Sequence, residues 1–237
     1  NGKPKAMLEI SGKTILDRQI ASFNSNGLSD ITVVSGYAGD KLKANSIQKI
    51  HNPNYAEGTT LHSLIMARSK MENGFIMLYS DILLEDQILS PLIRCQEDIV
   101  IVVDNSIQYR RHEEGKVVDF VISRNKISTS RRKIRFVYEN LISKIGDKIN
   151  PTEATHEFIG LAKLSKTGAE NFIQTFEDCA QNYDGSLSES ESFSQFSFTN
   201  LIQEMINRGF PVHFFEIHQG WLEIHDENDV ALANEMF

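Results

Sequence analysis

The chain has 237 residues, of which 41% are apolar and 24% are charged, as is typical of a globular protein with one substantial core. It contains no run of about 18 apolar residues, so the sequence predicts no membrane-spanning helix. The formal charge of -8 argues against a protein that binds duplex nucleic acid, because such proteins present a basic face. It does not exclude a nucleotide ligand, since a few local cations and a metal ion can override the overall sign.

The cysteines and histidines indicate neither a disulfide framework nor a zinc site. Cys95 and Cys179 lie far apart in the sequence and form no CxxC pair. The seven histidines show no HxxxH spacing. The sequence shows no secretory n-region and h-region, so we expect a cytoplasmic protein with reduced cysteines.

In chain order, the first hundred residues alternate between predicted helices and predicted strands. Helices are expected over residues 14–25, 59–71 and 85–95, and strands over 31–34, 75–80 and 99–104. The last of these strands is a continuous β-branched run, which is typical of a central parallel strand covered on both faces. The alternation predicts stacked βαβ units and a mostly parallel sheet flanked by helices.

Residues 107–150 interrupt this pattern with short segments, 116–122 and 133–138, that are typical of exposed strands in a small antiparallel extension. Beyond it we expect strands over 157–164, 211–217 and 222–224, and helices over 166–182, 199–207 and 226–237. The segment 184–194 is rich in Ser and Glu and is predicted to be a mobile surface loop. The basic cluster Arg131–Lys133, with Arg110 and Arg111 before it, is interpreted as solvated charge.

The strand predicted over residues 75–80 ends abruptly in Asp81. In open α/β sheets, ligands bind in the crevice beyond the carboxyl ends of the strands. A carboxylate there can hold Mg²⁺ against a phosphate, because this ion uses only one or two protein carboxylates together with phosphate oxygens. The alternative is that Asp81 caps a helix that begins at Ile82.

Several segments, taken in order, resemble the nucleotidyltransferases that make NDP-sugars, CDP-choline and CMP-phosphonates. They are Lys3–Leu16, Val34–Tyr37, Asn52–Tyr55, Ser63–Leu64, Tyr79–Leu83, Glu157–Gly160 and Gly220–Ile224. The segments SDILL, DIVIVVD, IGDKI and EATHEFIGLAKLS are most similar to cytidylyltransferase domains of phosphonate biosynthesis. Phosphocholine cytidylyltransferases and sugar-1-phosphate nucleotidyltransferases are close neighbours of that group.

The resemblance implies one Rossmann-like nucleotidyltransferase domain over residues 1–237, with the antiparallel extension of residues 107–150 inside it. The family begins with a strand and a Gly-x-Gly-x-Arg loop that wraps the triphosphate, and neither precedes Asn1. We favour an omitted N-terminal segment over a chain that cannot bind the nucleotide. A fused or neighbouring enzyme domain of the phosphonate pathway would fit the resemblance, and the oligomeric state is left open.

The implied reaction joins two anions, so the protein must neutralise charge and align the reactants. By motif match, Asp81 and Glu223 are the expected ligands of a Mg²⁺ ion that bridges nucleotide and acceptor. Lys5 is the expected contact to the phosphates and, with Asp81, the expected catalytic pair. The alternatives are a solvated lysine for Lys5 and a surface ion pair for Glu223.

The remaining expected site residues also follow from the resemblance. Thr59, Thr60 and Ser63 lie in the segment that approaches base and ribose in relatives, although helix capping explains them equally well. The residues expected to contact the acceptor are Lys144, Lys148, Glu157 and Trp221. Relatives have a lysine where this chain has Asp147, and Lys148 is the residue that could take over its role.

Four positions carry alternatives or departures from the family pattern. Glu157 could instead cap a strand, and Trp221 could be a core residue. His225 stands where relatives have an aspartate, and histidine is a poor Mg²⁺ ligand. Asp226 would cap the last helix.

The sequence leaves three functions open. The first is a metal-dependent cytidylyltransferase that moves CMP from CTP to a small phosphonate or a phosphocholine-like acceptor and releases pyrophosphate. The second is the same chemistry on a sugar 1-phosphate. The third is a non-catalytic nucleotide-binding or scaffold domain.

Overall fold

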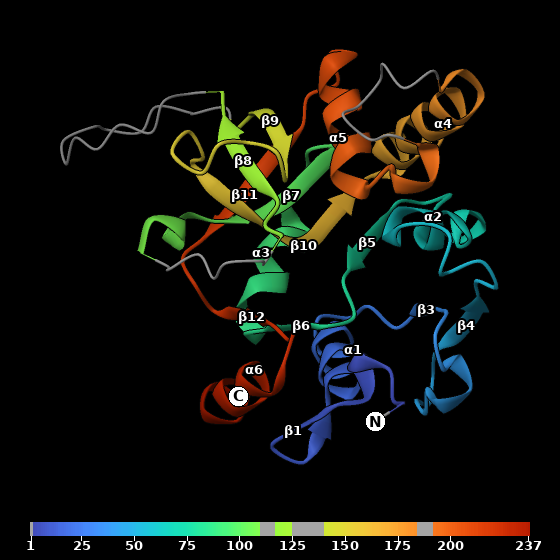
Figure 1. Ribbon diagram of the computed structural model, residues 1–237, viewed down its shortest axis with the longest axis vertical. Helices are drawn as coiled ribbons and strands as arrows, with labels where there is room; N and C mark the ends of the chain where they lie inside the picture. Colours follow the sequence, from blue (N-terminus) through green and yellow to red (C-terminus); the bar gives the residue numbers. More distant parts are fainter. Residues whose placement is uncertain (1, 110–116, 125–139, 184–191) are drawn as a thin grey trace.

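The strand predicted over residues 99–104 lies in the middle of a six-stranded mixed sheet. The computed structural model describes residues 2–109, 117–124, 140–183 and 192–237 (Figure 1). Within these ranges the strands are β1 (Glu9–Ile10), β2 (Lys13–Thr14), β3 (Thr32–Ser35), β4 (Gln48–His51), β5 (Phe75–Leu78), β6 (Ile82–Leu84), β7 (Ile99–Asp104), β8 (Phe120–Ser123), β9 (Ile142–Gly146), β10 (His156–Leu164), β11 (His213–Ile217) and β12 (Trp221–Glu223). The helices are α1 (Ile15–Ser25), α2 (Thr60–Ile65), α3 (Leu89–Arg94), α4 (Lys166–Asn182), α5 (Phe198–Asn207) and α6 (Glu227–Met236).

The main sheet has the order β11-β7-β10-β8-β9, and β5 also pairs with β10. Strands β5, β7, β8 and β11 run in one direction, while β9 and β10 run in the opposite direction. Every residue of β7 is buried, as expected for a central strand with both faces covered. The expected mixed α/β class, with helices on both faces of the sheet, is confirmed.

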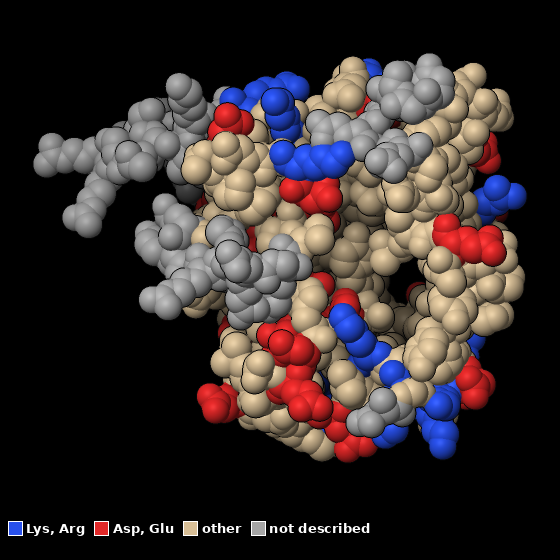
Figure 2. Space-filling model, viewed as in Figure 1, with Lys and Arg blue, Asp and Glu red and all other residues tan. Residues whose placement is uncertain are grey.

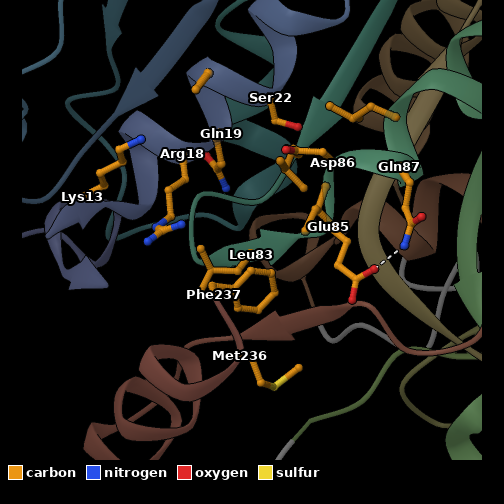
Figure 3. Close-up of a pocket in the computed structure, with 14 residues that line it drawn as sticks. Lys13, Arg18, Gln19, Ser22, Leu83, Glu85, Asp86, Gln87, Met236 and Phe237 are labelled. Atoms are coloured by element: carbon orange, nitrogen blue, oxygen red, sulfur yellow. Dashed lines mark hydrogen bonds between the residues drawn. The ribbon is translucent and has the colours of Figure 1, made fainter. Parts of the chain in front are cut away.

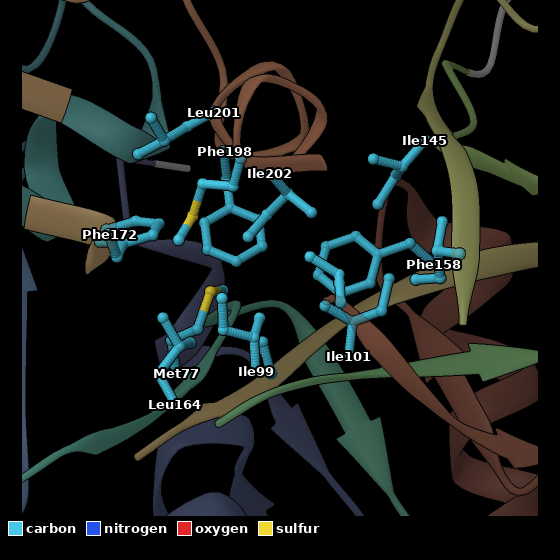
Figure 4. Packing of buried hydrophobic residues seen from close by; sticks show 14 of the residues in the cluster. Met77, Ile99, Ile101, Ile145, Phe158, Leu164, Phe172, Phe198, Leu201 and Ile202 are labelled. Atoms are coloured by element: carbon cyan, nitrogen blue, oxygen red, sulfur yellow. The ribbon is translucent and has the colours of Figure 1, made fainter. Parts of the chain in front are cut away.

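Helices α2, α4 and α5 contribute to a hydrophobic cluster on one face of the sheet (Figure 1). At its centre the rings of Phe158 and Phe198 stack with centroids 5.6 Å apart, and Phe172 contacts Phe198 from α4 (Figure 4). Alternate residues of β7, Ile99 and Ile101, point into this cluster. A strand places successive side chains on opposite faces, so the other β7 residues face a different core.

The opposite face is covered by α3 together with residues of α1, β6 and β12. Val100 and Val102 of β7 pack there with Leu89, Leu92 and the ring of Trp221. Smaller clusters join α6 to β1 and α1 to the N-terminal segment. The elements therefore form three layers, with the sheet between two sets of helices.

Short pairs of strands complete the fold: β1 with β2, β3 with β4 and β6 with β12. No helix in the described residues is long and apolar enough to cross a bilayer. Helix α1 is capped by Thr14, whose hydroxyl accepts the backbone N–H of Asp17. Helix α6 begins at the predicted cap Asp226.

Some predicted bounds are wrong. The helix expected over 59–71 ends at Ile65, and the one expected over 85–95 is α3 preceded by a single 3₁₀ turn. Residues 82–84 form a strand, so Asp81 does not cap a helix at Ile82. Of the antiparallel extension, β8 is largely buried in the main sheet rather than exposed. The segment 133–138, the two basic clusters and most of the Ser/Glu-rich loop lie outside the described residues.

A buried carboxylate ties the end of β7 to β12. Asp104 is fully buried, and its oxygens accept from the backbone and hydroxyl of Ser106, the backbone of Gln219 and the indole Nε1 of Trp221 at 2.7–3.1 Å. Burial alone would raise the pKa of Asp104, but these hydrogen bonds outweigh it and hold the pKa below its usual value. The ionised form is therefore the one that stabilises the fold.

We expect Asp104→Asn to lower the free energy of unfolding by about 1–3 kcal/mol at pH 7. The NH₂ group of the asparagine would face Ser106, Gln219 or Trp221 groups that are themselves hydrogen-bond donors. Since the native pKa is depressed, the carboxylate stabilises the wild type above the unfolded-state pKa of about 3.9 and loses this effect as pH falls through the native pKa. The gap between wild type and variant in urea unfolding should thus shrink below about pH 4. Equal stability of the two proteins at pH 7 would contradict this account.

Candidate active site

The chain turns sharply after β5, and this turn presents Asp81 at the end of the strand. Gln19 of α1 holds the turn from behind: its Nε2 donates to the carbonyl oxygens of Tyr79 at 2.9 Å and Ile82 at 2.8 Å. The backbone on both sides of Asp81 is therefore fixed to helix α1.

Strand β12 brings Glu223 beside this turn, although the two segments lie far apart in the sequence. Glu223 pairs with Ile82 in the antiparallel ladder of β6 and β12, and the N–H of Ile224 donates to the carbonyl of Asp81 at 2.9 Å. Glu223 therefore lies opposite Ile82 and Ile224 lies opposite Asp81, so the backbones of Asp81 and Glu223 occupy adjacent positions of the ladder.

Each of the two carboxylates has a nitrogen-bearing side chain next to it. Lys5 Nζ lies 3.1 Å from Asp81 Oδ2 in a pair that is partly exposed. His225 Nε2 lies 3.2 Å from Glu223 Oε1, and its Nδ1 is 3.7 Å from Asp229. The structure thus brings together Lys5, Asp81 and Glu223, and it makes His225 a neighbour of Glu223.

The hydroxyl of Tyr79 lies among several carboxylates. Burial raises the pKa of Tyr79 well above its usual value, and the negative charge of Asp119 adds to this effect. A hydrogen bond with Thr60 acts in the opposite direction, whereas the charges of Asp81 and Glu223 raise the pKa further. Tyr79 is therefore neutral at physiological pH and can donate a hydrogen bond.

Gly160 makes room for the ring of Tyr79. It has a φ of 77°, and a Cβ at this position would lie 2.6 Å from Tyr79 Cδ2. The Tyr79 ring packs edge-on against Phe158, with centroids 6.2 Å apart. The glycine of the quoted segment Glu157–Gly160 is thus required by the packing beside the site.

The three hydroxyls expected near the nucleotide have partners inside the protein. Thr59 is the N-cap of α2 and donates to the carbonyl of Phe196 at 2.8 Å. Thr60 bonds to Tyr79, and Ser63 accepts from the side chain of Asn52 at 3.0 Å. These contacts are those of helix capping and packing, which is the alternative stated from the sequence.

The residues expected at the acceptor are spread over three strands. Lys144 is exposed on β9, Lys148 follows that strand, and Glu157 on β10 pairs with Asp104 and Phe120. Trp221 is only 5% exposed, and its Nε1 donates to Asp104. Its surroundings are those of a core tryptophan, the alternative stated from the sequence, and we do not carry it forward as an acceptor contact.

The side chains of the site can be compared with what a Mg²⁺ ion needs as ligands. Among the described residues, no group of three or more His, Cys, Asp and Glu side chains could hold one. Two carboxylates at neighbouring positions nevertheless fit Mg²⁺, which takes one or two protein carboxylates and completes its shell with water and phosphate oxygens. Asp81 and Glu223 are the two carboxylates that the ladder brings to adjacent backbone positions, and Lys5 supplies a positive charge beside Asp81.

Asp119 was missed by sequence reasoning. Burial raises its pKa to about 6 against the opposing hydrogen bond from Thr199, and the charge of Asp147 raises it further. Asp119 precedes β8, whereas the signal that revealed Asp81 was a carboxylate beyond the carboxyl end of a strand, so that signal did not point to Asp119. Gln19 gave no signal, because a polar residue on a helix is ordinarily solvated.

The molecule is hollowed in the view of Figure 2, and both acidic and basic side chains lie at the rim of the hollow. A separate pocket of about 520 Å³ lies behind the site, between α1, β6 and the C-terminal residues. Figure 3 shows Lys13 and Arg18 on one side of it, Glu85 and Gln87 on the other, and Phe237 between them. None of the expected site residues lines this pocket.

Comparisons with known proteins identify the family of this chain. Residues 1–142 match the family model described as "MobA-like NTP transferase domain". A CTP:phosphoglutamine cytidylyltransferase of Campylobacter jejuni is 26% identical, and the match covers 98% of this chain and 92% of that protein.

Two solved structures share the fold. The inositol-1-phosphate CTP transferase of T. maritima has a TM-score of 0.68 at 16% identity, over 99% of this chain and 87% of the other. The CTP:phosphocholine cytidylyltransferase of Streptococcus pneumoniae has a TM-score of 0.68 at 17% identity, over 99% and 90%. The chain belongs to the family of MobA-like NTP transferase domains and is a nucleotidyltransferase of the cytidylyltransferase-like kind.

Proposed function

We propose that the protein is a metal-dependent cytidylyltransferase that transfers CMP from CTP to a small phosphonate or a phosphocholine-like acceptor. An anionic oxygen of the acceptor attacks the α-phosphorus of CTP, a new P–O bond forms, and the bond to the departing pyrophosphate breaks. The observation that carries the proposal is the β6–β12 ladder, which places Glu223 beside Asp81 while Lys5 reaches Asp81.

The chemistry needs neutralisation of charge more than it needs a covalent nucleophile. Lys5 supplies a cation that can move from Asp81 to the phosphates, since their ion pair is partly exposed and an exposed pair is worth only about 0–1 kcal/mol. Asp81 and Glu223 would hold Mg²⁺, which stabilises the negative charge of the reacting phosphates when bound. Gln19 keeps the Asp81 turn in place.

The choice of CTP is supported by the names of the relatives, which act on phosphoglutamine, phosphocholine and inositol 1-phosphate with this nucleotide. All three acceptors are small molecules with a phosphate group. The phosphonate acceptor rests on the resemblance of segments such as Ser80–Leu84 and Glu153–Ser165 to the phosphonate cytidylyltransferases.

The test is pyrophosphate release by a protein of full natural length, with each NTP, Mg²⁺ and a panel of acceptors. Release with CTP and either 2-aminoethylphosphonate, 2-hydroxyethylphosphonate or phosphocholine supports the proposal, and EDTA should abolish it until Mg²⁺ is added back. Release only with a sugar 1-phosphate, or undiminished release in EDTA, would contradict it.

We expect Asp81→Asn and Glu223→Gln each to lower kcat by at least roughly a hundredfold, because each removes negative charge from the place where the cation is held. Thermal unfolding should barely change, since the Lys5–Asp81 pair is partly exposed. Asp86→Asn is the matched control, because Asp86 is exposed and has no part in the site. Full activity of Asp81→Asn or Glu223→Gln would remove that residue from the mechanism.

Gln19→Leu removes both hydrogen bonds that fix the turn around Asp81, so we expect a loss of about 1–3 kcal/mol in unfolding free energy together with a lower kcat. Gln96→Leu is the control: Gln96 is exposed, and its Nε2 donates to the carbonyl of Arg94 away from the site. Stability and kcat should be measured on the same preparations. An unchanged kcat in a clearly destabilised Gln19→Leu protein would show that the turn does not need this support.

A further inference from the structure

Strands β5 and β8 lie one after the other along the same edge of β10, and a short gap separates them. The N–H of Phe158 donates to the carbonyl of Asp119, just before β8, and the N–H of Tyr79, just after β5, donates to the carbonyl of Gly160. Strand β5 leaves β10 where β8 approaches it, with Ile159 between the two contacts. In open α/β sheets, ligands bind in the crevice beyond the carboxyl ends of the strands, and Asp81 lies beyond that end of β5.

Asp119 and Asp81 lie on either side of this gap, because one precedes β8 and the other follows β5. Both charges raise the pKa of the Tyr79 hydroxyl, so both carboxylates lie near it. A short acceptor whose phosphate is held near Lys5 and Asp81 would therefore extend toward Asp119.

The carboxylate of Asp119 is anchored by one oxygen and open at the other. Its Oδ1 accepts from the hydroxyl of Thr199 on α5 at 2.8 Å. Within the described part of the chain, Oδ2 has no hydrogen-bond partner and no Lys, Arg or His pairs with this carboxylate. A half-buried carboxylate without a cation is costly, and neighbouring Asp147 increases that cost.

Glu157, the acidic residue expected at the acceptor, is less well placed. Directly paired residues of an antiparallel ladder share a face, so Asp119 lies on the side of Phe158 and of α5. Glu157 is the next residue of β10 and faces the other side, where it pairs with Asp104. The Tyr79 ring lies on the Phe158 side, with Asp119.

We propose that Asp119 recognises an ammonium group on the acceptor, with its open Oδ2 as the binding atom and Thr199 as the residue that orients it. The inference rests on the proposed function and narrows its acceptor to a small phosphonate or phosphate that carries a cationic nitrogen. The positive group supplies the counter-ion that Asp119 lacks among the described residues. An uncharged acceptor would leave Oδ2 of this half-buried carboxylate without a cation.

The experiment compares two acceptors that differ only at the recognised group, 2-aminoethylphosphonate and 2-hydroxyethylphosphonate, with CTP and Mg²⁺ at pH 8. At this pH Asp119 is ionised, since its pKa is about 6. The wild type should have the lower KM for the amine. Asp119→Asn should raise that KM by roughly tenfold to a hundredfold, the loss expected for one charge-assisted hydrogen bond, with kcat changing much less.

The KM values of Asp119→Asn for 2-hydroxyethylphosphonate and for CTP should stay within about twofold of wild type, as the amide keeps its bond to Thr199. Thr199→Val should raise the KM for the amine by a smaller factor. Glu153→Gln is the control, because Glu153 is exposed between β9 and β10, and it should change the KM for neither acceptor.

Equal KM values for both acceptors in wild type, or equal losses for both in Asp119→Asn, would overturn this inference while leaving the cytidylyltransferase in place. Absence of turnover with CTP and every acceptor would instead contradict the proposed function, and the inference with it.

Discussion

The site depends on one short antiparallel ladder, in which β12 returns from the end of the chain to pair with β6. This pairing alone places Glu223 next to Asp81, and a bond from Ile224 to the Asp81 carbonyl extends it to the turn. The ladder is braced on both sides. Gln19 holds the β5–β6 turn from α1, and buried Asp104 holds the indole of Trp221 at the start of β12. Residues that never touch a substrate thus set the positions of two that would.

The charges of three carboxylates, Asp81, Asp119 and Glu223, act on Tyr79, and no Lys, Arg or His of the described residues pairs with Asp119. Lys5 offsets Asp81 in a partly exposed pair, whereas Asp119 keeps a raised pKa because burial and Asp147 both disfavour its charge. A protein that only needed stability would gain from removing such a carboxylate. The arrangement is better explained by ligands that bring positive charge, a divalent cation at Asp81 and Glu223 and a cationic group at Asp119.

Much of the fold could be predicted because the signals were local. The all-buried strand β7, the cap Asp226 and the bounds of α4 follow from apolar runs and capping residues. Asp81 stood out because an apolar run ended in it. Strands β6 and β12 have three residues each, too few to show a period, so their pairing could not be predicted. The partner of Trp221 and the role of Gln19 arise from long-range contacts that leave no local pattern.

The most direct test of the account is whether Asp81 and Glu223 hold one cation together. Mn²⁺ can replace Mg²⁺ as an ion visible by electron paramagnetic resonance, and its binding can be titrated in the presence of CTP. The account predicts that the wild type binds Mn²⁺ and that Asp81→Asn and Glu223→Gln each weaken binding by at least roughly tenfold, the smallest loss usual even for residues that only support a metal ligand. Wild-type affinity for Mn²⁺ in Glu223→Gln would show that the two carboxylates do not share an ion.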